Sequence, residues 1–435
     1  MRIAAKFGLS LGTLIVASQM ACAATLTIAT VNNDDMITMQ KLSGQWEQAT
    51  GNKLNWVILE ENVLRQKVTT DIATKSGQYD IVTIGALETP IWGKKGWLTP
   101  LDDLGADYDY EDVFKPVRNG LSSDGKLYAV PFYAESSFTM YRTDLFKQAG
   151  IAMPEQPTWD QIRDFAAKLT DKSKGQYGIC LRGKPGWGEN MALITDMANT
   201  WGGKWFDMQW HPQLTSKPWE DAVGFYVDVM TKYGPPGATA NGFNENQALF
   251  AGGHCAIWVD ATSAAGRLYN KDTSKVTDVI GYAKAPGEVT NIGEGWFWAW
   301  ALAIPSTTKN VDAAKSFAKW ATSKEYVQLV AKTGGIITSP PGTRKSTYTD
   351  AYLKAAPFAE MTLKSILTAD PTKPTLDPVP YTGISFVIIP PYQGIGATTG
   401  QDIAGALAGQ TTVEKALQSA QESTIHAMTQ AGYIK

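Results

Sequence analysis

Histidine and cysteine are scarce in this sequence, with three of each among 435 residues. The histidines, His211, His254 and His426, lie far apart and show no spacing typical of a metal site. The sequence contains neither a phosphate-binding glycine loop nor a Gly-x-Ser-x-Gly motif. Nothing therefore supports a metalloenzyme, a nucleotide-binding enzyme or a serine hydrolase, and we expect no metal, no cofactor and no catalytic residues.

A basic excess and long apolar runs are also missing. The 39 Lys and Arg residues are outnumbered by 42 Asp and Glu residues, for a net charge of −3, whereas a nucleic-acid-binding surface needs clustered cations. After the N-terminal region, no stretch reaches the roughly 18 uninterrupted apolar residues of a membrane helix. We expect no nucleic-acid partner and a soluble mature protein.

The first 23 residues have the pattern of an export signal. Arg2 and Lys6 supply a positive start, residues 7–17 supply a short apolar stretch, and small residues flank Cys22. We expect cleavage after Ala23 and a periplasmic protein. Cleavage just before Cys22, with lipid attached to that cysteine, is the alternative.

Cleavage after residue 23 would leave Cys180 and Cys255 as the remaining cysteines. An even count in an oxidising compartment permits a disulfide between them. Two buried free thiols are the alternative, because sequence alone does not bring their Cα atoms within bonding range.

Strands and helices alternate along the chain. A strand at 26–31 leads into a loop and helix-capping cluster at 32–35, a helix follows, and the order repeats through strands at 54–59 and 79–84. The same order restarts later, with a capping box at Thr158 and Gln161, strands at 177–181, 256–259 and 295–304, and helices at 219–233, 313–320 and 325–332. Such alternation predicts two α/β lobes, each built on a parallel sheet with both faces covered.

Several segments resemble the extracellular solute-binding proteins of carbohydrate ABC importers. In family order they are 79–85 (YDIVTIG) with 96–103 (GWLTPLDD), 129–133 (AVPFY) with 140–146 (MYRTDLF), 248–258 (ALFAGGHCAIW), 300–305 (WALAIP) and 404–421. Segments 295–300 (GWFWAW) and 379–386 (VPYTGISF) are similar to the branch that binds sugar alcohols such as mannitol, sorbitol or arabitol.

The resemblance implies a two-lobed periplasmic-binding-protein architecture with hinge strands and a ligand cleft between the lobes. It implies an N-terminal lobe of 25–134 plus 286–343 and a C-terminal lobe of 135–285 plus 344–435, and a hinge that closes on the ligand. It also implies a membrane permease as partner, and we expect a monomer.

A polyol site needs carboxylates to accept from adjacent hydroxyls, Arg and Asn side chains to donate back, and aromatic faces over the C–H edges. An unmatched buried hydroxyl costs about 1–3 kcal/mol. Fifteen tryptophans suit such a site.

In the first lobe, Glu60 and Glu88 follow predicted strands, where open α/β sheets bind ligands, with Glu61 as the alternative to Glu60. The resemblance implies that Glu135, after the crossing between the lobes, contacts ligand, although a hinge salt bridge is the alternative. It places Asn33 and Asp34 at a ligand-contacting turn, where capping a helix is the alternative role.

In the second lobe, Trp258 and Asp260 share one face of a strand in a region where the family contacts ligand. Arg182 and Trp187 flank a flexible glycine-containing loop, although Arg182 could be a surface charge. The remaining aromatic candidates are Trp296 and Trp298, with Trp300 on the same face but expected in the core, and Tyr392, where the family places a late aromatic contact.

These features predict a receptor that binds a polyol, closes and presents it to the permease. A mono- or disaccharide is the alternative ligand. A secreted glycosidase would need two carboxylates about 5–9 Å apart, one of them with a raised pKa, and nothing in the sequence marks such a pair. A chemoreceptor adaptor with the same fold and ligand is a further alternative.

Overall fold

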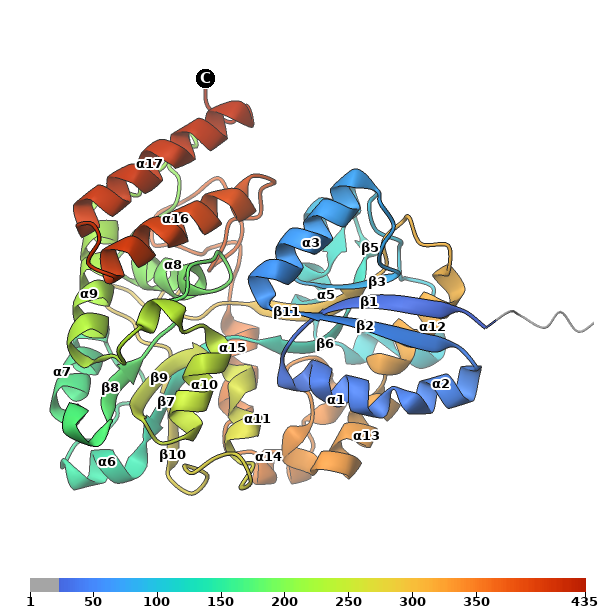
Figure 1. The fold of residues 1–435 in the computed structure, drawn as a ribbon, viewed down its shortest axis with the longest axis horizontal. Helices are drawn as coiled ribbons and strands as arrows, with labels where there is room; N and C mark the ends of the chain where they lie inside the picture. Colours follow the sequence, from blue (N-terminus) through green and yellow to red (C-terminus); the bar gives the residue numbers. More distant parts are fainter. Residues whose placement is uncertain (1–22) are drawn as a thin grey trace, which may run out of the picture.

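Two β-sheets organise the chain, which a computed structural model describes from residue 23 to residue 435. The expected export signal up to Cys22, including the alternative lipidation site, lies outside the described residues. Each sheet forms the centre of one lobe, and the two lobes lie side by side in Figure 1.

The first sheet has the strand order β2-β1-β3-β11-β6. Its strands are β1 (Thr25–Val31), β2 (Lys53–Leu59), β3 (Ile81–Ile84), β6 (Ala129–Glu135) and β11 (Trp298–Ala303). β1 is parallel to β2 and β3, but β11 is antiparallel to both β3 and β6. The expectation of a purely parallel sheet was therefore wrong, because β11 returns from the second lobe and runs in the opposite direction.

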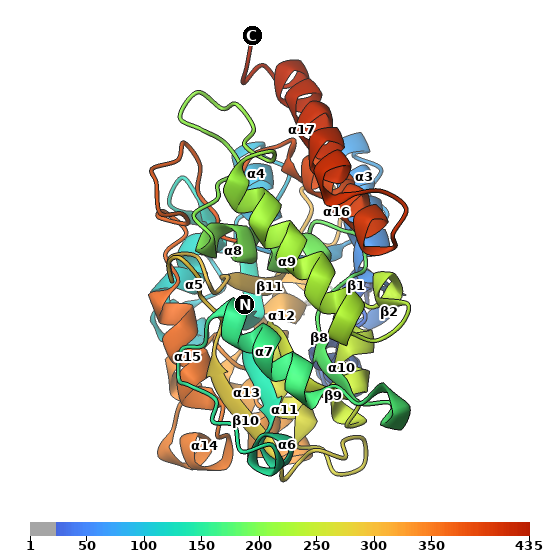
Figure 2. The ribbon, with the colours of Figure 1, turned by 90° about the vertical axis from the view of Figure 1, so that its left-hand side faces the viewer.

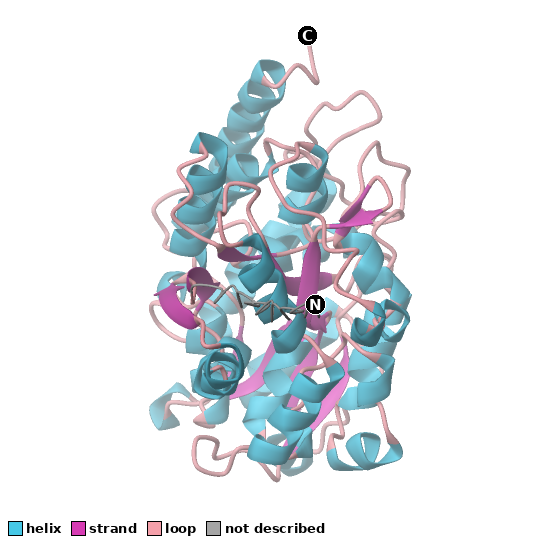
Figure 3. Cartoon of the chain, turned by 90° about the vertical axis from the view of Figure 1, so that its right-hand side faces the viewer, coloured by secondary structure: helices cyan, strands magenta, loops and turns pink. Residues whose placement is uncertain are grey.

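Helices cover both faces of this sheet: α3 lies on one side of β1 and β2, and α1 and α2 lie on the other (Figure 1). The helices of this region are α1 (Asp34–Leu42), α2 (Gly44–Thr50), α3 (Glu61–Thr74), α4 (Glu88–Lys94), α5 (Lys115–Gly120), α12 (Val311–Ala321) and α13 (Lys324–Gly334), with a short hairpin of β4 (Ser122–Ser123) and β5 (Lys126–Leu127). The predicted apolar face of α3, made of Leu64, Val68 and Ile72, is buried. In Figure 3, which looks onto this lobe, the strands lie among the helices.

The second sheet has the order β10-β7-β9-β8, formed by β7 (Ser137–Arg142), β8 (Tyr177–Cys180), β9 (Cys255–Ala261) and β10 (Ile280–Lys284). Only β8 and β9 run parallel, so this sheet is also mixed. Its helices are α6 (Thr143–Gln148), α7 (Trp159–Leu169), α8 (Asn190–Thr200), α9 (Lys217–Tyr233), α10 (Phe243–Ala251), α11 (Ala265–Leu268), α14 (Asp350–Ala355), α15 (Ala359–Thr368), α16 (Tyr392–Leu407) and α17 (Val413–Gln430). In Figure 2, α7 and α9 lie in front of β8 and β9.

Local sequence signals explain where several elements begin. Thr158 and Gln161 form the predicted capping box at the start of α7. Asn33 caps α1 by accepting a hydrogen bond from the backbone N–H of Met36 at 3.0 Å, and Glu60 caps α3. Both caps follow the carboxyl ends of parallel strands, so the first lobe presents two helix N-termini at one edge.

The chain crosses between the lobes at short connections. Only Ser136 separates β6 from β7, and the chain returns between β10 and β11. Arg344 and Ser346 still bond to Asp112 of the first lobe, at 3.2 and 2.7 Å. Residues 344–346, just after the expected boundary at residue 343, thus remain attached to the first lobe.

A disulfide joins Cys180 at the end of β8 to Cys255 at the start of β9, with their Cα atoms 5.9 Å apart. Both cysteines are fully buried in a small core of the second lobe. Among residues 23–435, no helix is both long and apolar enough to cross a membrane.

We expect the Cys180→Ala/Cys255→Ala double variant to lose about 2–4 kcal/mol of unfolding free energy, because the bond closes a chain segment of 75 residues. Urea unfolding of the variant and of the oxidised protein measures the loss. Wild-type protein unfolded with reductant should match the variant. Equal stability of oxidised protein and variant would show that the cross-link adds nothing.

Candidate ligand-binding site

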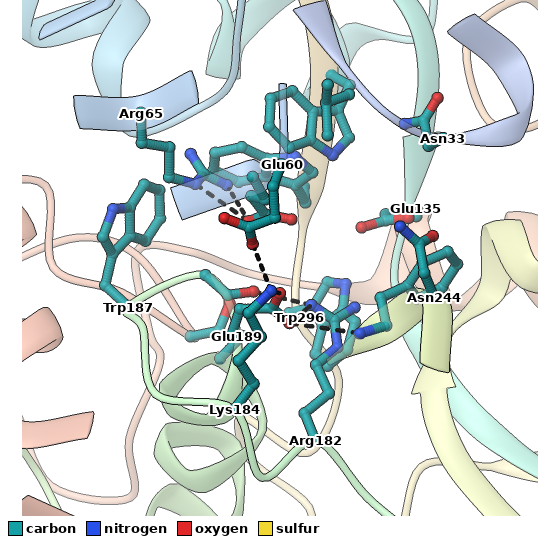
Figure 4. A pocket seen from close by; sticks show the side chains of 18 of the residues that line it. Asn33, Glu60, Arg65, Glu135, Arg182, Lys184, Trp187, Glu189, Asn244 and Trp296 are labelled. Atoms are coloured by element: carbon teal, nitrogen blue, oxygen red, sulfur yellow. Dashed lines mark hydrogen bonds and ion pairs between the residues drawn. The ribbon is translucent and has the colours of Figure 1, made fainter. Parts of the chain in front are cut away.

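A cavity of about 800 Å³, counting the space open to solvent at its mouth, lies between the two lobes. Charged, polar and aromatic side chains from both lobes line it (Figure 4). They are Asn33, Glu60, Glu61, Arg65, Tyr133, Glu135, Arg182, Lys184, Trp187, Glu189, Phe243, Asn244, Glu245, Trp296, Trp298, Trp300, Ser385 and Phe386.

Most of the residues predicted from the sequence meet in this cavity. Those that line it are Asn33, Glu60, Glu135, Arg182, Trp187, Trp296 and Trp298. Glu61, the alternative to Glu60, lines it as well. Trp300 is buried in the core, as expected, and it also lines the cavity. Period-two alternation gives it the same face of β11 as Trp298, so both rings reach the cavity wall.

The other predicted residues do not line the cavity. Glu88 and Asp260 lie behind it and pair with the arginines of its wall. Trp258 is fully buried between Phe243 and Phe250. Tyr392 is fully buried and packs edge-on against Trp187. Asp34 lies in the first turn of α1, forms an ion pair with Arg267, and lines a separate cleft.

Sequence reasoning missed several lining residues, among them Arg65, Tyr133, Lys184, Glu189 and Asn244. A signal existed for Arg65, since it stands four residues after Glu61 and directly beside the apolar face of α3. Lys184 lies inside the glycine-containing loop that was expected to present Arg182 and Trp187. The positions of Glu189 and Asn244 depend on how the lobes meet.

Arg65 forms the centre of one wall. Its guanidinium lies over Trp187 at 3.8 Å from the ring centroid, and over Trp300 and Trp298 at 4.8 and 5.0 Å. Its Nη1 donates to Glu88 at 2.9 Å, while its Nε and Nη2 donate to Glu61 at 3.0 and 2.7 Å. These contacts fix the planar cation on both its edges and its face.

Two neighbouring groups in turn hold Glu88 in place. Its carboxylate accepts hydrogen bonds from the backbone N–H of Gly85 at 3.1 Å and from Gln393 at 3.0 Å. The ring of Trp298 lies so close to Gly85 that a Cβ there would come within 2.0 Å of it. Gly85 is therefore required for the close approach of Trp298 to β3.

Arg182 is held in the same way on the second lobe. Its Nη2 donates to Asp260 at 2.7 Å and its Nη1 to the carbonyl of Gly188 at 2.8 Å. Trp258 donates from Nε1 to the other oxygen of Asp260 at 3.1 Å. Trp258 and Asp260, predicted as ligand contacts, thus position Arg182 from behind.

Two carboxyl groups of the cavity are more basic than usual. Burial raises the pKa of Glu135 to about 8, although the Ser263 hydroxyl donates to it and lowers the value. Burial also raises the pKa of Glu189, and the nearby Glu61 adds to the effect. In a ligand-free closed cavity at pH 7, Glu135 therefore holds a proton most of the time.

Hydrogen bonds connect the lobes across the mouth of the cavity. Lys184 donates to Glu60 at 2.6 Å, and Asn62 donates to the carbonyl of Pro185 at 3.1 Å. Asn244 donates to the carbonyl of Asn32 at 3.1 Å. Figure 4 shows Lys184 reaching from the second lobe toward Glu60. The structure is therefore in a closed arrangement.

Because the Glu88 side chain is only 3% exposed, removing its cation should be costly. We expect Arg65→Met to lower the unfolding free energy by about 3–5 kcal/mol, measured by urea unfolding. Lys174→Met, whose cation is 77% exposed in its pair with Asp171, is the control and should change stability very little. A small loss of unfolding free energy in Arg65→Met would mean that Glu88 can take up a proton at little cost in free energy.

Comparison with known proteins places this geometry in a family. Residues 31–328 match the model of the bacterial extracellular solute-binding proteins. The chain is 56% identical, over 414 residues and 95% of both chains, to a mannitol-binding protein of Pseudomonas aeruginosa.

Two solved structures have the same fold. An ABC transporter solute-binding protein of Agrobacterium vitis S4, with bound D-mannitol, has a TM-score of 0.93 and 58% identity, covering 95% of this chain and 100% of that one. A solute-binding protein of Agrobacterium radiobacter K84, in complex with ribitol, has a TM-score of 0.81 and 26% identity, covering 92% and 98%. The chain belongs to the bacterial extracellular solute-binding protein family.

Proposed function

We propose that this protein is the substrate-binding component of an ABC importer and that it captures a linear polyol, with mannitol as the first candidate. It releases the polyol unchanged to a membrane permease. The expected export signal at residues 1–23 would deliver it to the periplasm, where it acts as a monomer.

The cavity between the lobes is the observation that carries the proposal. It combines carboxyl groups of Glu60, Glu61 and Glu135 with donors from Asn33 and Arg182. Each hydroxyl of a polyol both donates and accepts, so a wall that alternates acceptors and donors can satisfy a whole chain of them. The mannitol-binding relative and the mannitol-bound structure support this choice of ligand.

Ligand capture follows from the position of the cavity. The polyol would contact residues of both lobes at once, so it binds the closed form more tightly than the open form. The equilibrium can shift toward closure by no more than this difference in affinity. The bonds of Lys184 to Glu60 and of Asn244 to Asn32 would form in the same step.

Calorimetric titration tests the proposal, with mannitol, sorbitol, arabitol, glucose and maltose as ligands. We expect micromolar binding of at least one linear polyol and none of glucose or maltose. Binding of a cyclic sugar but of no polyol would support the receptor function and refute the polyol assignment. Binding of none of these ligands would refute the proposed ligand class.

Within the site, Glu135→Ala should weaken polyol binding more than tenfold, or by more than about 1.4 kcal/mol. The buried carboxyl would otherwise pair with ligand hydroxyls, and its loss leaves them unmatched. Glu220→Ala, on the exposed first turn of α9, is the control and should bind like wild type. Unchanged affinity of Glu135→Ala in the same titration would remove Glu135 from the site.

A further inference from the structure

The carboxylates that line the cavity differ in how they are neutralised. Glu60, Glu61 and Glu189 each have a lysine or arginine nitrogen within 4.0 Å. Glu245 is exposed and caps the start of α10. Glu135 is the exception: it is 6% exposed, and among residues 23–435 it has no ion pair.

The cation nearest to Glu135 already has another partner. Its hydrogen-bond partner is the hydroxyl of Ser263 in the second lobe. Arg182 faces it, but the carboxylate of Asp260 takes that cation at 2.7 Å. Figure 4 shows the Glu135 carboxyl apart from the ion pairs of the cavity. The charged and titratable groups that face Glu135 are Arg182 and Asp260 of the second lobe, Glu61 of α3 and Tyr133 of its own strand.

Aromatic rings stand beside this carboxyl. Trp298 is its register partner across β6 and β11, so the two side chains share one face of the sheet. Tyr133 and Trp296 line the same cavity. A buried carboxyl without a cation of its own, next to aromatic rings, is a setting in which proteins hold organic ammonium groups.

We propose that this cavity also takes amino-alditols, which are linear polyols with one hydroxyl replaced by a primary amine, and that their ammonium group binds Glu135. The inference rests on the proposed function, because the remaining hydroxyls would use the polyol site. It extends that function to a cationic class of ligand.

Such binding has a defined proton balance. The pKa of Glu135 lies at about 8 because of burial, so this carboxyl holds a proton at pH 7 in the empty cavity. An ammonium ligand keeps its own proton and needs the carboxylate form, so the proton of Glu135 passes to solvent. Affinity therefore rises with pH up to about pH 8, by at most about tenfold per pH unit. A neutral polyol carries no such requirement.

The experiment is calorimetric titration of the exported protein with mannitol and with 1-amino-1-deoxymannitol, at pH 6, 7 and 8. Buffers of different ionisation enthalpy give the number of protons exchanged. We expect the amino-alditol to bind and to release close to one proton at pH 7, with clearly fewer for mannitol. Mannitol binding without amino-alditol binding overturns the inference and leaves the proposed function intact. Binding of neither overturns both.

Variants locate the ammonium group. Glu135→Gln should reduce the ratio of amino-alditol affinity to mannitol affinity at pH 8 at least tenfold and abolish the proton release. Glu220→Gln, which removes an exposed carboxyl in the first turn of α9 away from the cavity, is the matched control and should keep that ratio. An unchanged ratio in Glu135→Gln overturns the inference. If that variant does not bind mannitol, the number of protons that the wild-type protein releases on binding the amino-alditol decides the question. The absence of such release overturns the inference.

Discussion

Charged side chains that are removed from water need partners, and the inter-lobe cavity depends on this constraint. Arg65 and Arg182 could not lie in its walls without Glu88 and Asp260, which are almost fully buried behind them. Desolvating an unpaired charge would cost several kcal/mol. With the pairs in place, both guanidiniums are fixed before any ligand arrives, so a polyol finds donors that need little reordering.

The two lobes bring these pairs together from distant parts of the chain. Arg65 and Glu88 come from helices that follow strands of the first sheet, whereas Arg182 and Asp260 lie at the ends of β8 and β9. Trp187, from the loop after β8, packs on Arg65 across the cleft. The contact of a second-lobe ring with a first-lobe cation can form only when the lobes are closed, so closure completes one wall of the cavity.

Sequence patterns predicted the lobes, most strands and much of the site, because periodicity and caps are local signals. They placed Asn33 and Glu60 at strand ends and Trp298 on a strand face, and the structure brings these side chains into the cavity. They did not separate lining residues from those behind them: Asp260 and Arg182 are adjacent in space, and only the fold shows which of them reaches the cavity. Mixed strand direction was also missed, because it depends on how β11 returns from the other lobe.

The positions of the two arginines bear on the choice between a linear polyol and a pyranose ring. A ring usually stacks on a free aromatic face, but Arg65 lies over Trp187, Trp298 and Trp300 within 5.0 Å. Arg182 lies 5.5 Å from the centroid of Trp296. Each of these rings thus gives one face to a cation and keeps less surface for stacking. An acyclic chain can place its narrow C–H edges on the aromatic surface that remains, whereas a pyranose ring needs a whole aromatic face for its main apolar contact. The same arginines that supply donors therefore favour the linear ligand.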